Sequence, residues 1–423
     1  MARSLLPAPD ARGPFSPGFW RSPLRGTWFT SVLGVVLLAG VTVLFVTGLL
    51  SYAAYNPDLS PVNDKTPDKG ILGFYLFSWP TDPPWLYRLT QGVHVTLGLA
   101  LVPVLLAKLW SVVPRLFTLP PTRSLTHALE RISLLLLVGG ALFEFVTGIL
   151  NVQLDYVFPG SFYPLHFYGA WVFFGAFLAH AVLKAPVAFR NLRRMREGGE
   201  ERADGQADAL AAPRPDPPTV SRRGALGLVG GGSLLLLATS AGRSFDGPLR
   251  QTAVLTPHGG PEPGGGPNGF QINKTAAYAG IRADETGEEA WRLAVTGRSG
   301  TVRLSRADLL GLPLHSAALP IACVEGWSTS DQWWRGVRLR DLAALVGHDD
   351  PVDVFVESLQ RRGAFRHAAL RANQVGDPRS LLALSVNGEE LTPDHGHPAR
   401  IIVPAAPGVL NTKWVARLTF GAL

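Results

Sequence analysis

Four stretches of the sequence are long and apolar enough to cross the hydrocarbon core of a membrane, which takes about 20 mainly apolar residues. They cover residues 28–54, 86–112, 125–152 and 163–189. A fifth run that begins at Gly224, GALGLVGGGSLLLLATSAG, is rich in glycine and only just long enough. The chain is 47% apolar and only 17% charged, and the apolar residues concentrate in the first 190 positions. The sequence therefore predicts an all-α transmembrane four-helix bundle followed by a fifth transmembrane helix.

Basic residues gather in alternate loops between these stretches. The segments before the first, after the second and after the fourth stretch are basic, whereas the other two loops are mainly acidic. In chain order the residues are Arg3, Arg12, Arg21, Arg25; Asp58, Asp64, Asp68, Asp82; Arg115, Arg123; Asp155; and Arg190, Arg193, Arg194, Arg196. Cytoplasmic loops carry the excess of Lys and Arg, so we expect a multi-pass protein of the cell membrane whose last domain is extracytoplasmic. The net charge of +7 then reflects topology, and we expect no nucleic acid as a partner.

Composition divides the chain into six predicted parts. They are a cytoplasmic N-terminal segment (1–27), the four-helix domain (28–190), a cytoplasmic linker (191–223), the fifth helix (224–242), a Gly- and Pro-rich linker (243–269) and a mixed α+β domain (270–423). Within the last part, VDVFVES, ARIIVPA and KWVARLTF predict strands, and SRADLLG and LRDLAALVG predict short helices. Asn387-Gly388 predicts a tight turn. We find no internal repeat.

The cytoplasmic linker ends in Ser221-Arg222-Arg223, directly before the weakly apolar fifth run. This arrangement resembles a twin-arginine export signal placed inside a chain. The alternative interpretation is one more basic flank of a membrane helix. Because twin-arginine export moves folded proteins, the signal implies that the last domain acquires a cofactor in the cytoplasm before it crosses the membrane.

Four histidines precede the Gly- and Pro-rich linker, and each falls in or at the edge of a predicted span: His94, His127, His166 and His180. Ionisable residues inside spans are costly and are functional candidates. The bundle resembles the di-haem cytochrome b subunits of bacterial respiratory enzymes. That resemblance implies two b-type haems, one between His94 and His166 near the outer surface and one between His127 and His180 near the inner surface. A single haem is the alternative.

Glu144 lies within the third span and has two interpretations. It is either a proton or quinone partner or a carboxyl group that forms hydrogen bonds inside the bundle, and we prefer the second.

Cys323 is the only cysteine of the 423 residues. An intramolecular disulfide is therefore excluded. A buried small apolar residue, a nucleophile and a metal ligand remain as its roles. A free thiol outside the cytoplasm is at risk of oxidation unless it is shielded or bound to a metal.

The sequence around Cys323 and near the C-terminus carries a family resemblance. CVEGW (323–327), WRGVRL (334–339) and VNGEELTPDHGHPARIIVPAAPGVLNTKW (386–414) resemble the sulfite-oxidase-type molybdopterin domain in order and spacing. The resemblance covers most of residues 270–423. It implies a molybdopterin cofactor whose molybdenum is bound by the Cys323 thiolate, a soft ligand suited to such a metal.

The same resemblance implies roles for further residues. Arg400 and Lys413 are expected to hold the pterin phosphate, as their chemistry allows. His395 and Asn411 are expected to contact the pterin, and Asn273 and Ser358 to play similar parts. Trp327 and Trp334 are interpreted equally as pocket walls or as core. Ala322 stands where sulfite-oxidising members carry a basic residue, and CVEGW is closer to the bacterial branch that contains periplasmic sulfoxide reductases.

The sequence thus favours a membrane-bound oxidoreductase that moves electrons from quinol through haem to molybdenum and reduces an S-oxide such as methionine sulfoxide. Its expected partners are the lipid bilayer, quinol or quinone, and a small sulfur-containing substrate or an oxidised protein. One alternative is the reverse flow, in which sulfite or another donor is oxidised and quinone reduced. Two others are a non-catalytic binding module and a cytochrome that works on quinone without molybdenum.

Overall fold

The computed structural model describes residues 27–59, 77–113, 124–151, 162–196, 220–245, 248–255, 265–361, 363, 365–421 and 423. The chain divides into two compact units. The first, here the helical unit, comprises Met1–Phe45, Leu97–Ile149 and Leu165–Ala238. The second, here the mixed unit, comprises Val46–Thr96, Leu150–Pro164 and Thr239–Leu423. Each of the five long helices described below contributes residues to both units.

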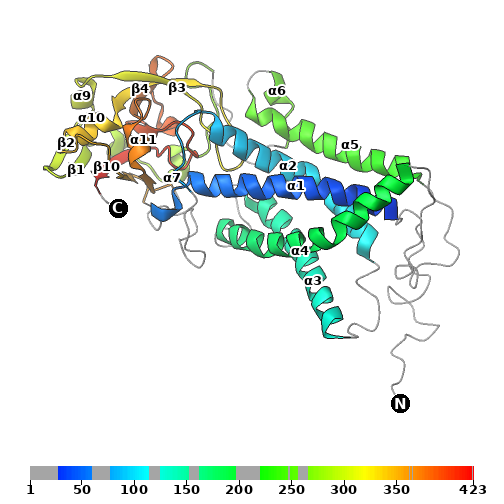
Figure 1. Ribbon diagram of the computed structural model, residues 1–423. Coiled ribbons are helices and arrows are strands. Elements are labelled where there is room, and N and C mark those ends of the chain that lie inside the picture. Colours follow the sequence, from blue (N-terminus) through cyan, green and yellow to red (C-terminus); the bar gives the residue numbers. More distant parts are fainter. Residues whose placement is uncertain are drawn as a thin grey trace. The chain divides into compact units, whose positions relative to one another are not determined.

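Five long helices form where the apolar stretches predict them (Figure 1). They are α1 (Thr27–Ala54), α2 (Leu86–Val112), α3 (Leu125–Asn151), α4 (Tyr163–Arg196) and α5 (Arg222–Ala241). Each is long and apolar enough to cross a bilayer. The expectation of five long apolar helices is therefore confirmed. Helix α4 continues to Arg196, beyond the expected end at residue 189.

The helical unit is held together by one apolar cluster with buried members from all five of these helices. Its buried members include Leu37 of α1, Leu101 of α2, Ala141 of α3 and Phe173 of α4. Gly40 allows close packing, because a Cβ at this position would lie 2.5 Å from a methyl carbon of Leu101. Many other apolar side chains of the helices are exposed, as expected for surfaces that face lipid.

A short repeat, which the sequence analysis missed, becomes visible once the helices are compared. FVTG occurs at residues 45–48 in α1 and at 145–148 in α3. In each case a histidine of the following helix lies against the Thr-Gly pair: His94 against Thr47, and His166 against Thr147. The two helical hairpins therefore share one local way of holding a histidine.

The mixed unit contains two five-stranded sheets. The first has the order β2-β1-β10-β5-β6, with β1 and β10 parallel and its other pairs antiparallel. Its strands are β1 (Leu293–Gly297), β2 (Gly300–Leu304), β5 (Val354–Ser358), β6 (His367–Leu370) and β10 (Val415–Phe420). The second has the order β3-β4-β7-β8, and β9 also pairs with β7. Its strands are β3 (His315–Leu319), β4 (Gln332–Arg338), β7 (Leu381–Val386), β8 (Glu389–Glu390) and β9 (Arg400–Ile402).

Short helices connect the strands. They are α6 (Pro248–Gln251), α7 (Ala276–Ala279), α8 (Ala283–Thr286), α9 (Arg306–Leu310), α10 (Leu339–Ala344) and α11 (Ala372–Gly376), with 3-10 turns η2 (Pro57–Leu59), η4 (Gly242–Ser244) and η5 (Pro393–His395). The predicted strands appear as β5, β9 and β10, and the predicted helices as α9 and α10. Ser305 and Asp308 form a capping box that starts α9. The turn Asn387-Gly388 joins β7 to β8, with positive φ at both residues.

The C-terminal end of α1 and the N-terminal end of α2 are part of the mixed unit. Tyr55 and Tyr87 are fully buried in the same apolar core as the strands of the first sheet. The Asn56 side chain donates to the carbonyl of Ala369 at 3.0 Å. The Trp79 indole donates to the carbonyl of Ala405 at 2.7 Å. The folded unit therefore begins well before residue 270, where composition placed the start of the last domain.

Candidate active site

Cys323 lies in a tight turn between β3 and β4. The Cys323 N–H donates to the carbonyl of Trp327 at 2.9 Å, and the Gly326 N–H donates back to the carbonyl of Cys323 at 3.0 Å. Gly326 has φ +86°, a conformation that glycine adopts without the strain a side chain would add. The Gly408 N–H donates to the carbonyl of Ala322 at 2.7 Å and ties the turn to the segment after β9. This turn, here the Cys323 turn (323–328), is therefore held by hydrogen bonds within itself and by one from the segment after β9.

The thiol of Cys323 is buried and lies 3.4 Å from Oε2 of Glu325. The same carboxylate oxygen accepts from the indole N–H of Trp327 at 2.7 Å. Burial, and then the charge of Glu325, hold the pKa of the Cys323 thiol well above its usual value. The group is therefore a neutral thiol that donates to a carboxylate. A metal ion that binds this sulfur must first displace the proton.

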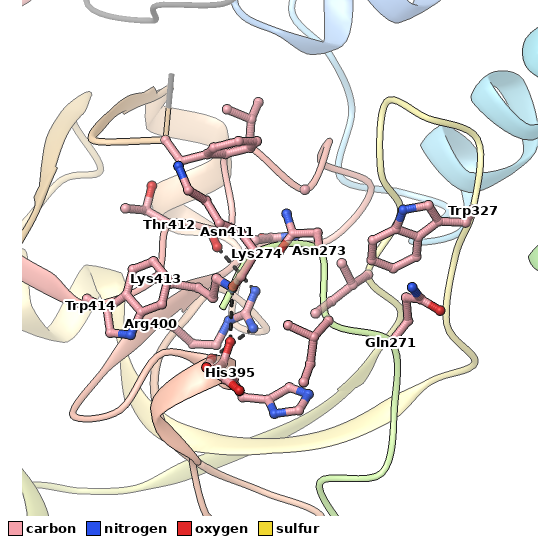
Figure 2. Close-up of a pocket in the computed structure, with 16 residues that line it drawn as sticks. Gln271, Asn273, Lys274, Trp327, His395, Arg400, Asn411, Thr412, Lys413 and Trp414 are labelled. Atoms are coloured by element: carbon pink, nitrogen blue, oxygen red, sulfur yellow. Dashed lines mark hydrogen bonds between the residues drawn. The ribbon is translucent and has the colours of Figure 1, made fainter. Parts of the chain in front are cut away.

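A pocket opens beside the Cys323 turn (Figure 2). Five of the residues that the sequence analysis assigned to the cofactor line it: Asn273, His395, Arg400, Asn411 and Lys413. They come from the segment before α7, from η5, from β9 and from the loop before β10. Ile321 and Trp327 also line the pocket, and Cys323 lies between these two residues in the sequence. A Cβ on the lining residue Gly408 would be 3.8 Å from the Cα of Cys323.

Ser358 is the one predicted cofactor residue outside this lining. Its hydroxyl donates to the carbonyl of Lys413 at 2.7 Å and accepts from the Gln360 N–H at 3.1 Å. It thus holds the backbone at Lys413 in place. Trp334 is fully buried, and its indole donates to the carbonyl of Leu319 at 2.9 Å, which favours the core interpretation for this residue.

Two basic side chains line the pocket, Arg400, which is buried, and Lys413, which is partly buried. Arg400 is 4% exposed, and its guanidinium donates to the carbonyls of His395 and Asn411 at 3.0 and 3.2 Å. Burial lowers the pKa of Arg400 to about 9. The ammonium of Lys413 donates to the carbonyls of Asp394, at 2.9 Å, and Lys274. Burial, and then the charge of Arg400, lower the pKa of Lys413 well below that of an ordinary lysine. Within the described residues, the polar contacts of both cations are to carbonyl oxygens and not to carboxylates.

His395 and Asn411 add neutral hydrogen-bonding groups. Burial, and then the charge of Arg400, lower the pKa of His395 to about 3, so its ring is neutral. His395 Nδ1 lies 2.8 Å from Thr392 Oγ1, and its Nε2 lies 3.3 Å from the carbonyl of Phe270. Asn411 Oδ1 accepts from the Val403 N–H at 2.9 Å, whereas its buried Nδ2 has no partner in the structure.

These groups fit a cofactor that carries a phosphate. A bound anion pairs with the desolvated guanidinium of Arg400, and it favours the charged ammonium form of Lys413 that burial disfavours. The unsatisfied Nδ2 of Asn411 and Nε of Arg400 offer further donors. A molybdopterin bound here would have its phosphate held by Arg400 and Lys413.

Sequence reasoning missed several lining residues, among them Gln271, Lys274 and Thr412. Lys274 follows the predicted residue Asn273 directly, and Thr412 lies between Asn411 and Lys413. Their positions in the sequence next to predicted residues were the one signal that could have found them. Gln271 had none, because its place depends on the fold of the segment before α7.

Two of the four membrane histidines have well-defined surroundings. Nδ1 of His94 and Nδ1 of His166 each lie 3.0 Å from a threonine Oγ1, of Thr47 and Thr147 respectively. Nδ1 of His166 also lies 3.1 Å from Glu144 Oε2, which agrees with the hydrogen-bonding interpretation of that carboxyl group. With Nδ1 held in this way, Nε2 is the nitrogen through which either ring would bind iron.

The glycines next to these threonines give the rings room. A Cβ on Gly48 or on Gly148 would lie 3.2 Å from Cε1 of the adjacent histidine. His180 lies within α4 and is half-buried. His127 is in α3, but its side chain lies outside the described residues. The pairing of the four histidines across two haems stays a prediction.

Comparison with known proteins shows which protein family the last domain resembles. Residues 279–422 match the family model of the oxidoreductase molybdopterin binding domain. Mitochondrial sulfite oxidase of Mus musculus is 32% identical over 156 residues, which cover 30% of this chain and 29% of that protein. The uncharacterized oxidoreductase YuiH of Bacillus subtilis (strain 168) is 31% identical over 131 residues, which cover 31% of this chain and 65% of that protein.

Among solved structures, the sulfane dehydrogenase SoxCD from Paracoccus pantotrophus matches with 24% identity over 32% of this chain and 39% of that chain, at a TM-score of 0.29. A TM-score this low carries no argument. The chain spans less than a third of the sulfite oxidase and about two thirds of YuiH. The family model and the residues of the pocket agree, and the part of the chain that follows the five long apolar helices is a molybdopterin-binding oxidoreductase domain of the sulfite oxidase family.

Proposed function

We propose that the protein is a membrane-bound molybdenum oxidoreductase that exchanges electrons between membrane quinol and a substrate outside the cytoplasm through haem b. In the preferred direction it reduces an S-oxide such as methionine sulfoxide. The domain family, the five apolar helices and the held histidines support this proposal.

One observation carries the electron-transfer part. The Cys323 turn lies directly against the stretch of α2 that bears His94, within the mixed unit. The side-chain amide of Gln91 donates to the carbonyl of Val324, the residue after Cys323. A Cβ on Gly326 would lie 2.7 Å from Cβ of Val95, the residue after His94. The predicted iron ligand His94 and the predicted molybdenum ligand Cys323 thus lie on two segments that contact each other directly.

The residues of the pocket have distinct roles in this proposal. Cys323 binds molybdenum as a thiolate, and Arg400 and Lys413 bind the pterin phosphate. His395, Asn411 and Asn273 contact the pterin from the pocket wall, and Ser358 positions Lys413. Glu325 accepts a hydrogen bond from Trp327 and so keeps the Cys323 turn in shape. The bound molybdenum cofactor supplies oxygen-atom transfer, a two-electron reaction.

The membrane part is proposed as a cytochrome b domain with two haems. His94 and His166 are the proposed ligands of the outer haem, and His127 and His180 those of the inner haem. Imidazole nitrogens suit iron. The twin-arginine motif at Arg222-Arg223 supports export of the folded last domain, which would place the catalytic site outside the cytoplasm.

The second candidate function is the reverse reaction, in which sulfite is oxidised and quinone reduced. The similarity to proteins named sulfite oxidase favours it. Ala322, the apolar residue before Cys323, favours the reductase.

Metal and haem stoichiometry tests the proposal. The purified full chain should contain one molybdenum and two haems, and Cys323→Ser should lose the molybdenum and keep the haems. Activity with methionine sulfoxide and quinol, but not with sulfite and quinone, would support the reductase, and the opposite result the dehydrogenase. Equal molybdenum in the wild type and in Cys323→Ser would refute the enzymatic proposal.

A further inference from the structure

Arg243 is a buried arginine whose guanidinium has no hydrogen-bond partner among the described residues. It lies in η4, just after α5, and is 1% exposed. Its Nε, Nη1 and Nη2 are all buried, and none forms a hydrogen bond in the structure. Arg243 precedes the residues that match the molybdopterin-domain family. It is also not among the residues that line the pocket, so the proposed cofactor site does not account for it.

The backbone around Arg243 is attached to the Cys323 turn. Its carbonyl accepts from the Ser328 N–H at 3.3 Å and from Arg250 Nη1 at 3.2 Å. The Ser244 hydroxyl donates to the carbonyl of Gly326 at 3.0 Å. Gly242 is needed here, because a Cβ would lie 2.1 Å from the carbonyl oxygen of Leu249. The structure thus fixes this arginine beside the turn that carries the proposed molybdenum ligand.

Helix α2 contacts the same segment from another side. The guanidinium of Arg88 donates to the carbonyl of Ser244 at 2.5 Å, and a Cβ on Gly92 would lie 3.4 Å from Ser244 Oγ. Arg88 and Gly92 are within two turns of His94 along α2. Arg243 is therefore placed where the turn of Cys323 and the helix of His94 meet.

No ion pair with another residue that the structure describes balances the charge of Arg243. Burial lowers the pKa of Arg243 to about 10, against the opposing effect of Glu325, so the group stays charged at neutral pH. Glu325 is not within ion-pair distance, and its Oε2 already accepts from Cys323 and Trp327. A buried cation without a partner is strongly unfavourable. Three rigidly arranged nitrogens suit an oxyanion or a carboxylate.

We propose that Arg243 binds the anionic group of a ligand at this junction, either a sulfur oxyanion of the substrate or a carboxylate of the haem held by His94. The inference rests on the proposed function, which supplies both ligands. Both offer the same chemistry, two or more oxygens with negative charge, and they approach from the two elements that meet at Arg243.

The test compares Arg243→Met and Arg243→Lys with the wild type as purified full chains that contain both cofactors. Sulfate serves as a non-reacting oxyanion, and its affinity is read from the rise in unfolding temperature. If the substrate is the source, Arg243→Met weakens sulfate binding about tenfold or more. If the haem is the source, the midpoint potential of one haem becomes more negative, because loss of a nearby cation favours the oxidised form. Arg243→Lys, which keeps the charge and loses the planar fork, should show the smaller change.

Two controls make the outcomes decisive. Arg306 is also buried but pairs with Glu390 at 2.9 Å, so Arg306→Met should lower stability and leave both readouts unchanged. Asp246, outside the described residues, is the carboxylate nearest to Arg243 in sequence. Asp246→Asn should also leave both readouts unchanged, and a change equal to that of Arg243→Met would overturn the proposal by assigning the pairing to Asp246.

If molybdenum and haem contents are normal and neither readout moves in Arg243→Met, the role of Arg243 is refuted. If the wild type contains neither cofactor, the proposed function fails instead.

Discussion

Oε2 of Glu325 lies 3.4 Å from Sγ of Cys323, so the proposed metal ligand is hydrogen bonded to a carboxylate two residues away. The same oxygen accepts from Trp327 at 2.7 Å. Glu325 is therefore a positioning residue: it fixes a wall of the pocket and keeps the thiol protonated while no metal is bound.

Replacement of Glu325 tests this arrangement. Glu325→Ala should lower the stability of the cofactor-free protein by about 1–3 kcal/mol, because the buried indole N–H of Trp327 loses its acceptor. Molybdenum content should not fall, since loss of the carboxylate lowers the pKa of the Cys323 thiol and favours the thiolate. Denaturant unfolding and metal analysis measure the two effects. The exposed Glu389 of β8 is the control, with an expected change for Glu389→Ala within about 0.5 kcal/mol. A stable Glu325→Ala protein that lacks molybdenum would contradict both expectations.

The lowered pKa of Lys413 predicts a pH dependence. In the cofactor-free protein burial favours the neutral amine, whereas a bound phosphate favours the ammonium form. Binding therefore takes up a proton at pH values above the lowered pKa, and affinity for the cofactor should fall as the pH rises through that window toward the ordinary value of 10.5. Pterin fluorescence after gel filtration at a series of pH values measures retention.

Variants of Lys413 check the cause. Lys413→Arg should move the loss of cofactor to higher pH, because a guanidinium keeps its charge more readily. Lys413→Met should weaken binding roughly tenfold or more and remove this part of the pH dependence. An identical alkaline profile for the wild type and Lys413→Met would show that another group is responsible.

Gly326 tests the contact between the Cys323 turn and α2. Gly326→Ala adds a Cβ 2.7 Å from Val95 Cβ at a residue with φ +86°. We expect a loss of about 1–2 kcal/mol from the backbone conformation alone, and a further loss from the contact. Gly388→Ala is the matched control, because Gly388 has φ +88° and its Cβ would meet nothing within 4 Å.

The difference between the two glycine variants isolates the contact with α2. We expect Gly326→Ala, and not Gly388→Ala, to slow electron transfer from reduced haem to the substrate in stopped-flow measurements. Val95→Ala, combined with Gly326→Ala, should restore part of the rate. Equal effects of the two glycine substitutions would show that the contact with Val95 does not matter.

The threonines of the FVTG repeat should tune the haem ligands. Thr47→Val and Thr147→Val remove the oxygen next to Nδ1 of His94 and His166, and loss of such a partner typically weakens metal binding about 10- to 100-fold. Haem content and the two midpoint potentials measure the effect. The Thr147 change should be the milder, because Glu144 also lies within reach of His166. Thr42→Val, on the exposed side of α1, should change neither quantity.

Much of the architecture was predictable because its causes are local. Helices α1 to α5 follow from continuous apolar stretches, and β5, β9, β10, α9 and α10 from short periodic patterns. The pocket residues Asn273, His395, Arg400, Asn411 and Lys413 were found through their motif. Their burial, and with it the lowered pKa values of Arg400 and Lys413, emerged only from the folded chain.

The remaining features depend on contacts between distant parts of the sequence. Nothing near Gln91 indicates that its amide meets Val324, 233 positions later. Arg243 reads as an ordinary linker arginine until its burial is known. Ser358 was assigned to the cofactor from the family resemblance, and in the fold its hydroxyl donates to the carbonyl of Lys413. The FVTG repeat was overlooked because four residues are too few to stand out before the two histidines are seen beside them.

Helix α1 ends and helix α2 begins at the apolar core of the mixed unit, in which Tyr55 and Tyr87 are buried. A fragment that begins at Arg243 would lack both tyrosines, expose the apolar surface that they cover and aggregate in aqueous buffer. The mixed unit is thus not an independent domain that is merely attached to the long helices. We expect it to fold only when it is expressed together with α1 and α2, whose ends are part of its core.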